Sequence, residues 1–290
     1  MAVPTDPDVT SIVTQALKRA GRTTPSAAQI QEAADHAIQE VKADIMLAAP
    51  THPNLMATAT TVTTKGQQRY EIPGDLNEYY SITLLDGPDS WRGTVQGSGA
   101  STITLANDLT ASADDLIGKY ILITGGTGIE QYREILGYDV GTKVATVDTA
   151  WSISPTTSST YLIVNDYCSL WPSPLATDIE TIRTQTVLQK PTLVGLFDQE
   201  YILYPIPDKS TYGLLARYWV DLSKLDESEP LFIQLLREWR SIWIQGVAVK
   251  SMQRFDEDRY QSEMAIYKVM LDALTNQTCI ITQVRFRDFV

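Results

Sequence analysis

The sequence predicts an α+β fold, with helices at both ends of the chain and strands between them. Apolar residues recur at helical spacing before residue 50 and after residue 230, and β-branched runs begin at Thr58. Residues 91–165 are rich in threonine, serine and glycine, with short runs between turn signals. We therefore expect an N-terminal helix pair, two long C-terminal helices and an inserted small β-barrel or sandwich domain.

The first element is a helix that begins at Asp6-Pro7 and ends at Gly21, because proline favours the first helical turn and glycine the C-terminal end. A second start signal, Thr24-Pro25, opens another helix, which Pro50 closes. The short link predicts a helical hairpin. Its second helix carries one apolar stripe: Ile30, Ala34, Ala37, Ile38, Val41 and Ile45.

Strands are expected on both sides of the insertion. Thr58–Thr64 is β-branched, Lys65-Gly66-Gln67 is typical of a turn, and 69–72 is then the return strand. Further extended segments are expected at 80–85, 179–188, 201–204 and 212–220.

Residues 91–165 are interpreted as an inserted domain, separate from a core made of 1–90 and 166–290. Several short strands with regular turn punctuation favour a small barrel or sandwich. The expected strands are 102–105, 120–124, 132–138, 144–148 and 161–164.

The C-terminal part predicts two helices. Pro230 begins what we expect to be the longest helix, running to Met252 with a stripe that includes Trp239 and Trp243. These tryptophans are four residues apart, and packing is favoured over base stacking. Residues 253–256 break the pattern, and the next helix carries Tyr260, Met264, Tyr267, Leu271 and Leu274 on one face.

Charge excludes a protein that grips nucleic acid through phosphates. The 290 residues include 35 acidic and 23 basic side chains, a net charge of -12, and no segment is basic. Two cysteines cannot form a disulfide framework or a CxxC pair. The N-terminus does not resemble a signal peptide, and no apolar run is long enough for a membrane span. We expect a protein of the reducing cytoplasm, with no membrane partner.

Motifs for catalysis are not found, so no catalytic, cofactor-binding or metal-binding residue is assigned. His36 is expected on a helix surface and His52 in a surface turn, and HExxH, GxSxG and Walker A patterns do not occur. The run 125–128 is glycine-rich, but β-like residues follow it, which favours a hairpin turn over a phosphate site. The acidic clusters 114–115 and 256–258 do not follow the EF-hand pattern.

The C-terminus is the one segment that suggests an interaction site. Residues 280–290 include Arg285, Phe286, Arg287 and Phe289, and aromatic residues with arginine are enriched in interface hot spots. A final strand that packs on its own domain is the alternative.

The order of several motifs resembles that of tailed-bacteriophage head-to-tail adaptor (connector) proteins. The insertion likewise resembles a β-module common in phage structural proteins. The segments that carry the two resemblances are Tyr70-Glu71-Ile72-Pro73, 121–128, 131–135, 146–148, 159–161, Leu203-Tyr204-Pro205-Ile206-Pro207-Asp208, 214–220, Leu225, 230–252 and 256–260.

The resemblance implies a helical bundle core with a β-extension, and a structural role without catalysis or cofactor. It implies a homo-oligomeric ring, commonly a dodecamer, which binds beneath the portal, carries a tail or neck protein and extends the DNA channel. Double-stranded DNA would pass without specific binding. The location implied is the head–tail junction of the virion, after assembly in the bacterial host cytoplasm. The terminal residues Arg285, Phe286, Arg287 and Phe289 are our prediction for portal docking.

Two other functions remain open from the sequence. One is another tail or neck ring, or a tail-completion protein, that uses the same β-module. The other is an enzyme or a glycan-binding protein whose insertion holds the ligand.

Overall fold

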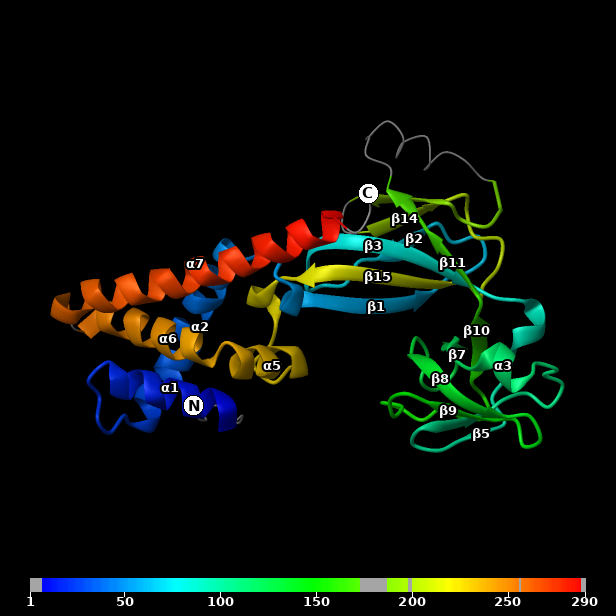
Figure 1. The fold of residues 1–290 in the computed structure, drawn as a ribbon, viewed down its shortest axis with the longest axis horizontal. Coiled ribbons are helices and arrows are strands. Elements are labelled where there is room, and N and C mark those ends of the chain that lie inside the picture. The colour runs from blue at the N-terminus through cyan, green and yellow to red at the C-terminus, as the bar shows by residue number, and fades with distance from the viewer. Residues whose placement is uncertain (1–6, 173–186, 198–199, 256, 288–290) are drawn as a thin grey trace. The chain divides into compact units, whose positions relative to one another are not determined.

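The computed structural model describes residues 7–172, 187–197, 200–255 and 257–287 (Figure 1). The chain separates into two compact units. Unit 1 comprises the described residues of Met1–Ala57, Gly74–Glu78 and Tyr218–Val290, and unit 2 comprises those of Thr58–Pro73 and Tyr79–Arg217.

Unit 1 is helical. Helix α6 lies between α7 and α1, and it also packs against α2 (Figure 1). The elements are α1 (Pro7–Arg19), α2 (Ala27–Ala48), α5 (Pro230–Glu238), α6 (Arg240–Phe255) and α7 (Glu257–Arg287), with short 3-10 helices η1 (Pro53–Leu55) and η3 (Leu222–Lys224).

The N-terminal helices begin and end at residues that favour helix ends. Helix α1 begins at Pro7, and Gly21 follows it with a φ of 93°, a conformation that glycine adopts readily. Helix α2 begins two residues after the predicted start, because Ser26 and Gln29 form a capping box in which each side chain accepts the other's backbone N–H.

The predicted helix from 230 to 252 is interrupted at Trp239. The backbone there has φ -104° and ψ 28°, so α5 ends after nine residues and α6 begins at Arg240. The indole of Trp243 donates to the carbonyl of Leu235 across this break. Even an unbroken helix over 230–252 would be shorter than α7, which has 31 residues and is the longest helix in the described part of the chain.

Sheet A, most of which belongs to unit 2, has the order β1 (Met56–Val62), β15 (Gly213–Val220), β3 (Leu76–Asp86) and β11 (Asp166–Ser169). Sheet B has the order β12 (Trp171–Pro172), β13 (Leu193–Phe197), β14 (Glu200–Tyr204) and β2 (Arg69–Glu71). The predicted hairpin of β1 and β2 is wrong, because β2 pairs with β14 and β1 with β15. One buried cluster joins residues of both sheets, including Leu84, Leu214, Tyr70, Tyr201 and Leu203.

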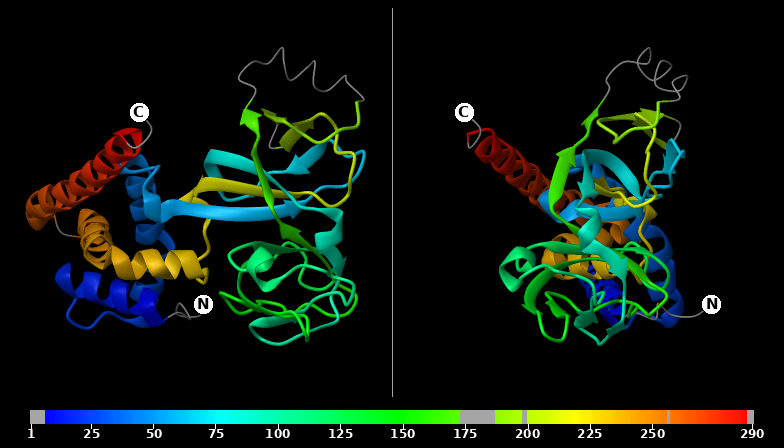
Figure 2. Two further views of the ribbon diagram at one scale, coloured as in Figure 1. Left: turned by 45° about the vertical axis from the view of Figure 1, so that its right-hand side comes forward. Right: turned by 90° about the vertical axis from the view of Figure 1, so that its right-hand side faces the viewer.

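Unit 2 also contains a seven-stranded sheet in the order β4-β10-β7-β8-β9-β6-β5. Its strands are β4 (Arg92–Thr94), β5 (Gly97–Ser98), β6 (Thr102–Thr104), β7 (Tyr120–Gly125), β8 (Tyr132–Asp139), β9 (Val144–Val147) and β10 (Thr160–Val164). The edge strands β4 and β5 are separated by only Val95 and Gln96. The chain itself thus joins the two edges, and the strands curve around a common interior (Figure 2). We call this part the barrel.

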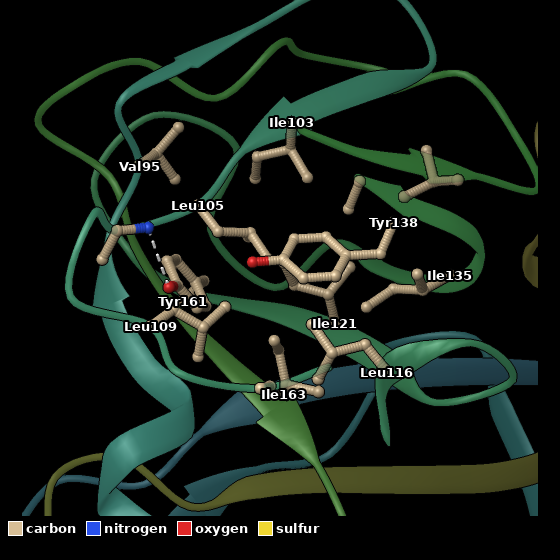
Figure 3. Close-up of a cluster of buried hydrophobic side chains, with 14 of the residues drawn as sticks. Val95, Ile103, Leu105, Leu109, Leu116, Ile121, Ile135, Tyr138, Tyr161 and Ile163 are labelled. Carbon is tan, nitrogen blue, oxygen red and sulfur yellow. Dashed lines mark hydrogen bonds between the residues drawn. The ribbon is translucent and has the colours of Figure 1, made fainter. Parts of the chain in front are cut away.

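Apolar side chains fill the interior of the barrel. Figure 3 shows Ile103, Ile121, Ile135 and Ile163 directed inward from different strands, beside Tyr161. The hydroxyl of Tyr161 accepts the N–H of Ala106 at 3.0 Å, so the one polar atom of this buried ring is satisfied. Two short helices belong to the same part of the chain, η2 (Asp89–Trp91) and α3 (Ala113–Leu116).

The predicted fold class is wrong. The chain is not a helical bundle core with a β-extension and two long C-terminal helices, but a mixed α/β protein with sheets of four, seven and four strands. The strands around the insertion do not extend a bundle, because sheets A and B bury a core of their own. The C-terminal part has three helices, since Trp239 divides the first one predicted.

Candidate interaction surfaces

The predicted docking residues lie at the end of α7. Arg285, Phe286 and Arg287 belong to its last turn, where the structure describes only the backbone, and Phe289 lies outside the described residues. A final strand is excluded for 280–287, because this segment is helical. Portal docking by these side chains remains a prediction.

The two histidines lie apart, in different surroundings. His36 is exposed on α2, as expected. The expectation for His52 is wrong, because this side chain is only 4% exposed. Its Nδ1 accepts the N–H of Asn54 at 3.2 Å, and its ring meets Trp239 edge-on at 5.1 Å between centroids. These contacts make His52 a packed residue at the start of η1.

The glycine-rich run 125–128 is a hairpin turn, as predicted. It connects the antiparallel strands β7 and β8, and Gly126 has a φ of 77°. A Cβ at Gly126 would lie 2.6 Å from the carbonyl oxygen of Ser158, so the close backbone approach requires glycine.

The acidic cluster 114–115 serves helix α3. Ser112 and Asp115 form a capping box at its start. Hydrogen bonds to the carboxylate, mainly from the side chain of Ser112 and also from its backbone, lower the pKa of Asp115. Within the described ranges, no three His, Cys, Asp or Glu side chains are grouped so as to hold a metal ion.

Among the residues whose side chains the structure describes, Lys42 is the most deeply buried charged one, with 1% exposure. Its Nζ donates to the carbonyl of Leu225 at 2.7 Å and lies 4.4 Å from the ring centroid of Phe232. Burial lowers the pKa of Lys42, and the charge of Glu227 partly opposes this. A lysine enclosed in this way ties α2 to the segment after η3 and is not accessible to a substrate.

Unit 1 has a cavity of about 160 Å³ between α1, α2 and α6. Its polar lining is already engaged: Lys250 pairs with Asp44 at 2.9 Å, Ser251 donates to the carbonyl of Val247, and Gln29 caps α2. Arg22 and Glu32, which also line it, have partners as well. The cavity therefore offers no free group that would recognise a ligand.

Three tyrosines gather where the barrel meets sheet A, and we call them the tyrosine cluster (Tyr120, Tyr132 and Tyr167). The rings of Tyr120 and Tyr132 stack at 4.7 Å, and the hydroxyls of Tyr132 and Tyr167 are 3.3 Å apart. Burial is the main cause that raises the pKa of Tyr132 far above its ordinary value. Because two of the rings cover each other, the cluster is a packing contact and not an open stacking platform.

Ion pairs fix the point where the chain passes from sheet A into the barrel. The guanidinium of Arg92 pairs with Asp86 at 2.7 Å and donates to the carbonyl of Thr211, also at 2.7 Å. Lys190 contacts the second carboxylate oxygen of Asp86 at 3.2 Å. We call Asp86, Arg92 and Lys190 the junction clamp. Sequence reasoning missed it, because Lys190 and Thr211 lie about a hundred residues from Arg92.

Helix α7 has a second face that is exposed and partly apolar. Ser262, Ile266, Val269 and Ala273 are exposed, and their spacing of four, three and four residues is that of a coiled-coil seam. Ile266 is 43% and Val269 68% exposed, whereas Tyr267 and Leu274 are buried on another face of the helix. We call these four residues the α7 ridge. Its spacing is visible in the sequence, but the expectation for this helix used only the face of Tyr267.

No protein-family model matches the chain, and no curated protein matches it. None of the helices in the described part of the chain is both long and apolar enough to cross a membrane.

Proposed function

We propose that this chain is a structural subunit of a tailed-phage virion, which forms a ring beneath the portal, joins head to tail and extends the DNA channel. The sequence motifs that resemble head-to-tail adaptors support this proposal by their order along the chain. The chain is not a helical bundle with a β-extension, so the fold class does not support this proposal. The proposal therefore rests on those motifs and on surface features.

The observation that carries the proposal is the α7 ridge. Exposed apolar side chains that line up on one face mark sites of protein interaction, because their contact with water is unfavourable. Ile266 and Val269 stand one turn apart on such a face, and another face of the helix already packs in unit 1 through Tyr267 and Leu274. In a permanent assembly, a neighbouring protein would cover this second face and remove its apolar side chains from water.

The charge of the chain fits a conduit for DNA. A net charge of -12 repels the phosphate backbone at short range, and at physiological salt this repulsion is screened over about 8 Å. A ring of such subunits lets duplex DNA pass without holding it.

The proposed partners are the portal protein, a tail or neck protein and further copies of this chain. Portal docking is assigned to Arg285, Phe286, Arg287 and Phe289 at the C-terminus. The proposed location is the head–tail junction of the virion, reached by assembly in the bacterial host cytoplasm.

The test is an affinity pull-down of the tagged chain from host cells that are producing virions, followed by mass spectrometry. We expect the portal and tail proteins to co-purify. Recovery of tail proteins without the portal would favour another tail or neck ring. Recovery of neither, in cells that contain assembled particles, would overturn the proposal.

A further inference from the structure

Strand β1 forms one edge of sheet A, and β15 pairs with its inner side (Figure 1). An edge strand presents backbone N–H and C=O groups that can pair with a strand of another chain. Charged residues and proline often prevent such pairing, but the β1 sequence, Met-Ala-Thr-Ala-Thr-Thr-Val, contains neither. The part of β1 in unit 2, 58–62, is also rich in β-branched residues, which favour strands. This edge therefore needs another form of protection.

Glu130, in the loop of the β7–β8 hairpin, contacts this edge. The hydroxyl of Thr60 donates to the main-chain carbonyl of Glu130, and the hydroxyl of Thr61 donates to its carboxylate at 2.7 Å. Successive side chains of a strand point to opposite faces of the sheet. A residue that contacts both threonines must therefore lie beside the strand and not over one face. Because β15 occupies the inner side, Glu130 lies on the side that is open to another strand.

The hairpin loop holds Glu130 in this position. The N–H of Glu130 donates to the carbonyl of Ile123 at 2.8 Å. The side chain of the next residue, Gln131, donates to the carbonyl of Ile153 at 2.7 Å and accepts the N–H of Ser152 at 2.8 Å. Glu130 has a φ of 71°, a left-handed conformation that residues other than glycine adopt rarely. Backbone strain of this kind persists where the surrounding contacts fix it, and it often marks a functional position.

The position of Glu130 is incompatible with a further strand. A strand added to β1 would lie about 4.8 Å from it, in the space from which Glu130 reaches Thr60 and Thr61. The added strand would also take the carboxylate out of water, which is strongly unfavourable for a charge without a partner. A glycine would fit this backbone without strain, but it would lack the carboxylate that accepts from Thr61.

We infer that Glu130 closes the β1 edge of sheet A to strand addition. The barrel hairpin thus protects the sheet from which the barrel extends, and this inference does not depend on the proposed function. The strand that Glu130 excludes most directly is β1 of a second copy. Every copy has the same uncharged edge, and two such edges can pair antiparallel.

Self-association of a variant without the carboxylate tests the inference. Glu130→Gly removes the side chain and fits the left-handed backbone. We expect sedimentation of the full-length variant to show an association that grows with concentration and that the parent chain lacks. In the same samples, hydrogen exchange in 58–62 should slow about fivefold, the factor that one hydrogen bond of ordinary net strength supplies.

The threonines of β1 provide an independent pair of variants. Thr60→Ala with Thr61→Ala removes both donors to Glu130 and lowers the strand propensity, so new pairing cannot come from a better strand former. This variant should associate as Glu130→Gly does. Thr60→Ser with Thr61→Ser is the matched control, because it keeps both donors, and it should behave like the parent chain.

The other outcomes overturn the inference. Unchanged sedimentation and exchange in Glu130→Gly and in the alanine pair would show that Glu130 does not protect the edge. Association without slower exchange in 58–62 would place the new contact elsewhere. Exchange in 58–62 that already slows with concentration in the parent chain would show an open edge. Lys143→Gly, at another left-handed position with a φ of 58°, should behave like the parent; equal association there would assign the effect to glycine in a hairpin.

Discussion

The buried residues Tyr161 and Tyr201 differ in whether the side-chain hydroxyl has a hydrogen-bond partner. Tyr161 and Tyr201 are both almost fully buried, and burial is the main cause that raises the pKa of each to about 12. The hydroxyl of Tyr161 accepts the N–H of Ala106, whereas that of Tyr201 has no hydrogen-bond partner among the described residues. The fold thus buries one tyrosine hydroxyl with a hydrogen bond and another without one.

Removal of each hydroxyl should change the free energy of unfolding in opposite directions. Tyr161→Phe leaves the buried N–H of Ala106 unpaired and should lower the free energy of unfolding by about 1–2 kcal/mol. Tyr201→Phe removes an unpaired polar atom and should raise the free energy of unfolding or leave it unchanged. Urea unfolding of the two variants beside the parent chain measures both values. Equal losses would show that Tyr201 has a partner, such as a buried water.

The buried tyrosines also predict alkaline instability. A phenol whose pKa is higher in the folded chain than the ordinary value near 10 keeps its proton longer than in the unfolded chain. The unfolded state therefore loses protons first, and its relative free energy falls as the pH rises. The stability that Tyr161 and Tyr201 contribute is complete below pH 10 and is lost between about pH 10 and 12.

The measurement is urea unfolding at several pH values from 8 to 11, with tyrosinate absorbance followed in parallel. Lys42 acts in the opposite direction, because its lowered pKa makes stability rise with pH up to 10.5. Lys42 no longer contributes above pH 10.5, whereas five tyrosines, four buried and Tyr132 partly buried, have raised pKa values: Tyr132, Tyr161, Tyr201, Tyr212 and Tyr267. A free energy of unfolding that stays constant from pH 9 to 11 would contradict this prediction.

At the scale of elements, the close approach of α6 to its neighbours depends on Gly246. A Cβ at this position would lie 2.7 Å from a methyl carbon of Val41 on α2 and 2.9 Å from the ring of Tyr267 on α7. Both distances are shorter than ordinary contacts, and all three helices meet at this point. The glycine is required by the packing and not by its backbone angles.

Gly246→Ala should therefore lower the free energy of unfolding by about 1–3 kcal/mol, although alanine is the better helix former. Thermal and urea unfolding measure the change. Gly74→Ala is the control, because no atom lies within 4 Å of the added Cβ there, and it should not destabilise the chain. A Gly246→Ala variant as stable as the parent would show that α6 and α7 separate easily.

Local patterns predicted the elements better than their pairing. All five strands expected between residues 102 and 164 occur within a residue or two, because β-branched runs and turn residues mark them directly. The pairing of β2 with β14 was missed, since it joins Tyr70 to Tyr201 across 131 positions that no local pattern relates. The break at Trp239 was missed because helical spacing continues through it.

At the scale of the whole molecule, the C-terminus is predicted to bind the portal. Arg285→Ala with Arg287→Ala should weaken portal binding at least about tenfold, because two interface arginines are removed. Folding should not change, since alanine favours the helix in which both residues lie. Surface plasmon resonance against purified portal measures the affinity.

Lys65→Ala with Lys119→Ala removes the same charge from unit 2 and is the matched control for this test. Unchanged affinity in the arginine variant would contradict the docking assignment. An equal loss in both variants would show a general charge effect instead.

The overall architecture was the least predictable property. The change from helical to alternating patterns correctly separated helices from strands along the chain. It did not show that the strands before and after residues 91–165 build two sheets with a shared core, because residues such as Leu84 and Leu214 meet only in the folded chain. The junction clamp was equally hidden, since its residues are far apart in the sequence and have no local signature.

The paired strands at the barrel entrance have a consequence for engineering. Asp86 on β3 lies opposite Asp166 on β11, and Arg92 on β4 lies opposite Leu162 on β10. The chain thus leaves and re-enters sheet A at points only one strand spacing apart, about 5 Å. Because the two ends of the inserted segment are neighbours, its length does not affect the distance between β3 and β11. A different small domain that replaces the barrel at this edge needs no change in the spacing of β3 and β11, but it must cover Leu85 and Leu215, which pack with Leu122 and Leu162 of the barrel.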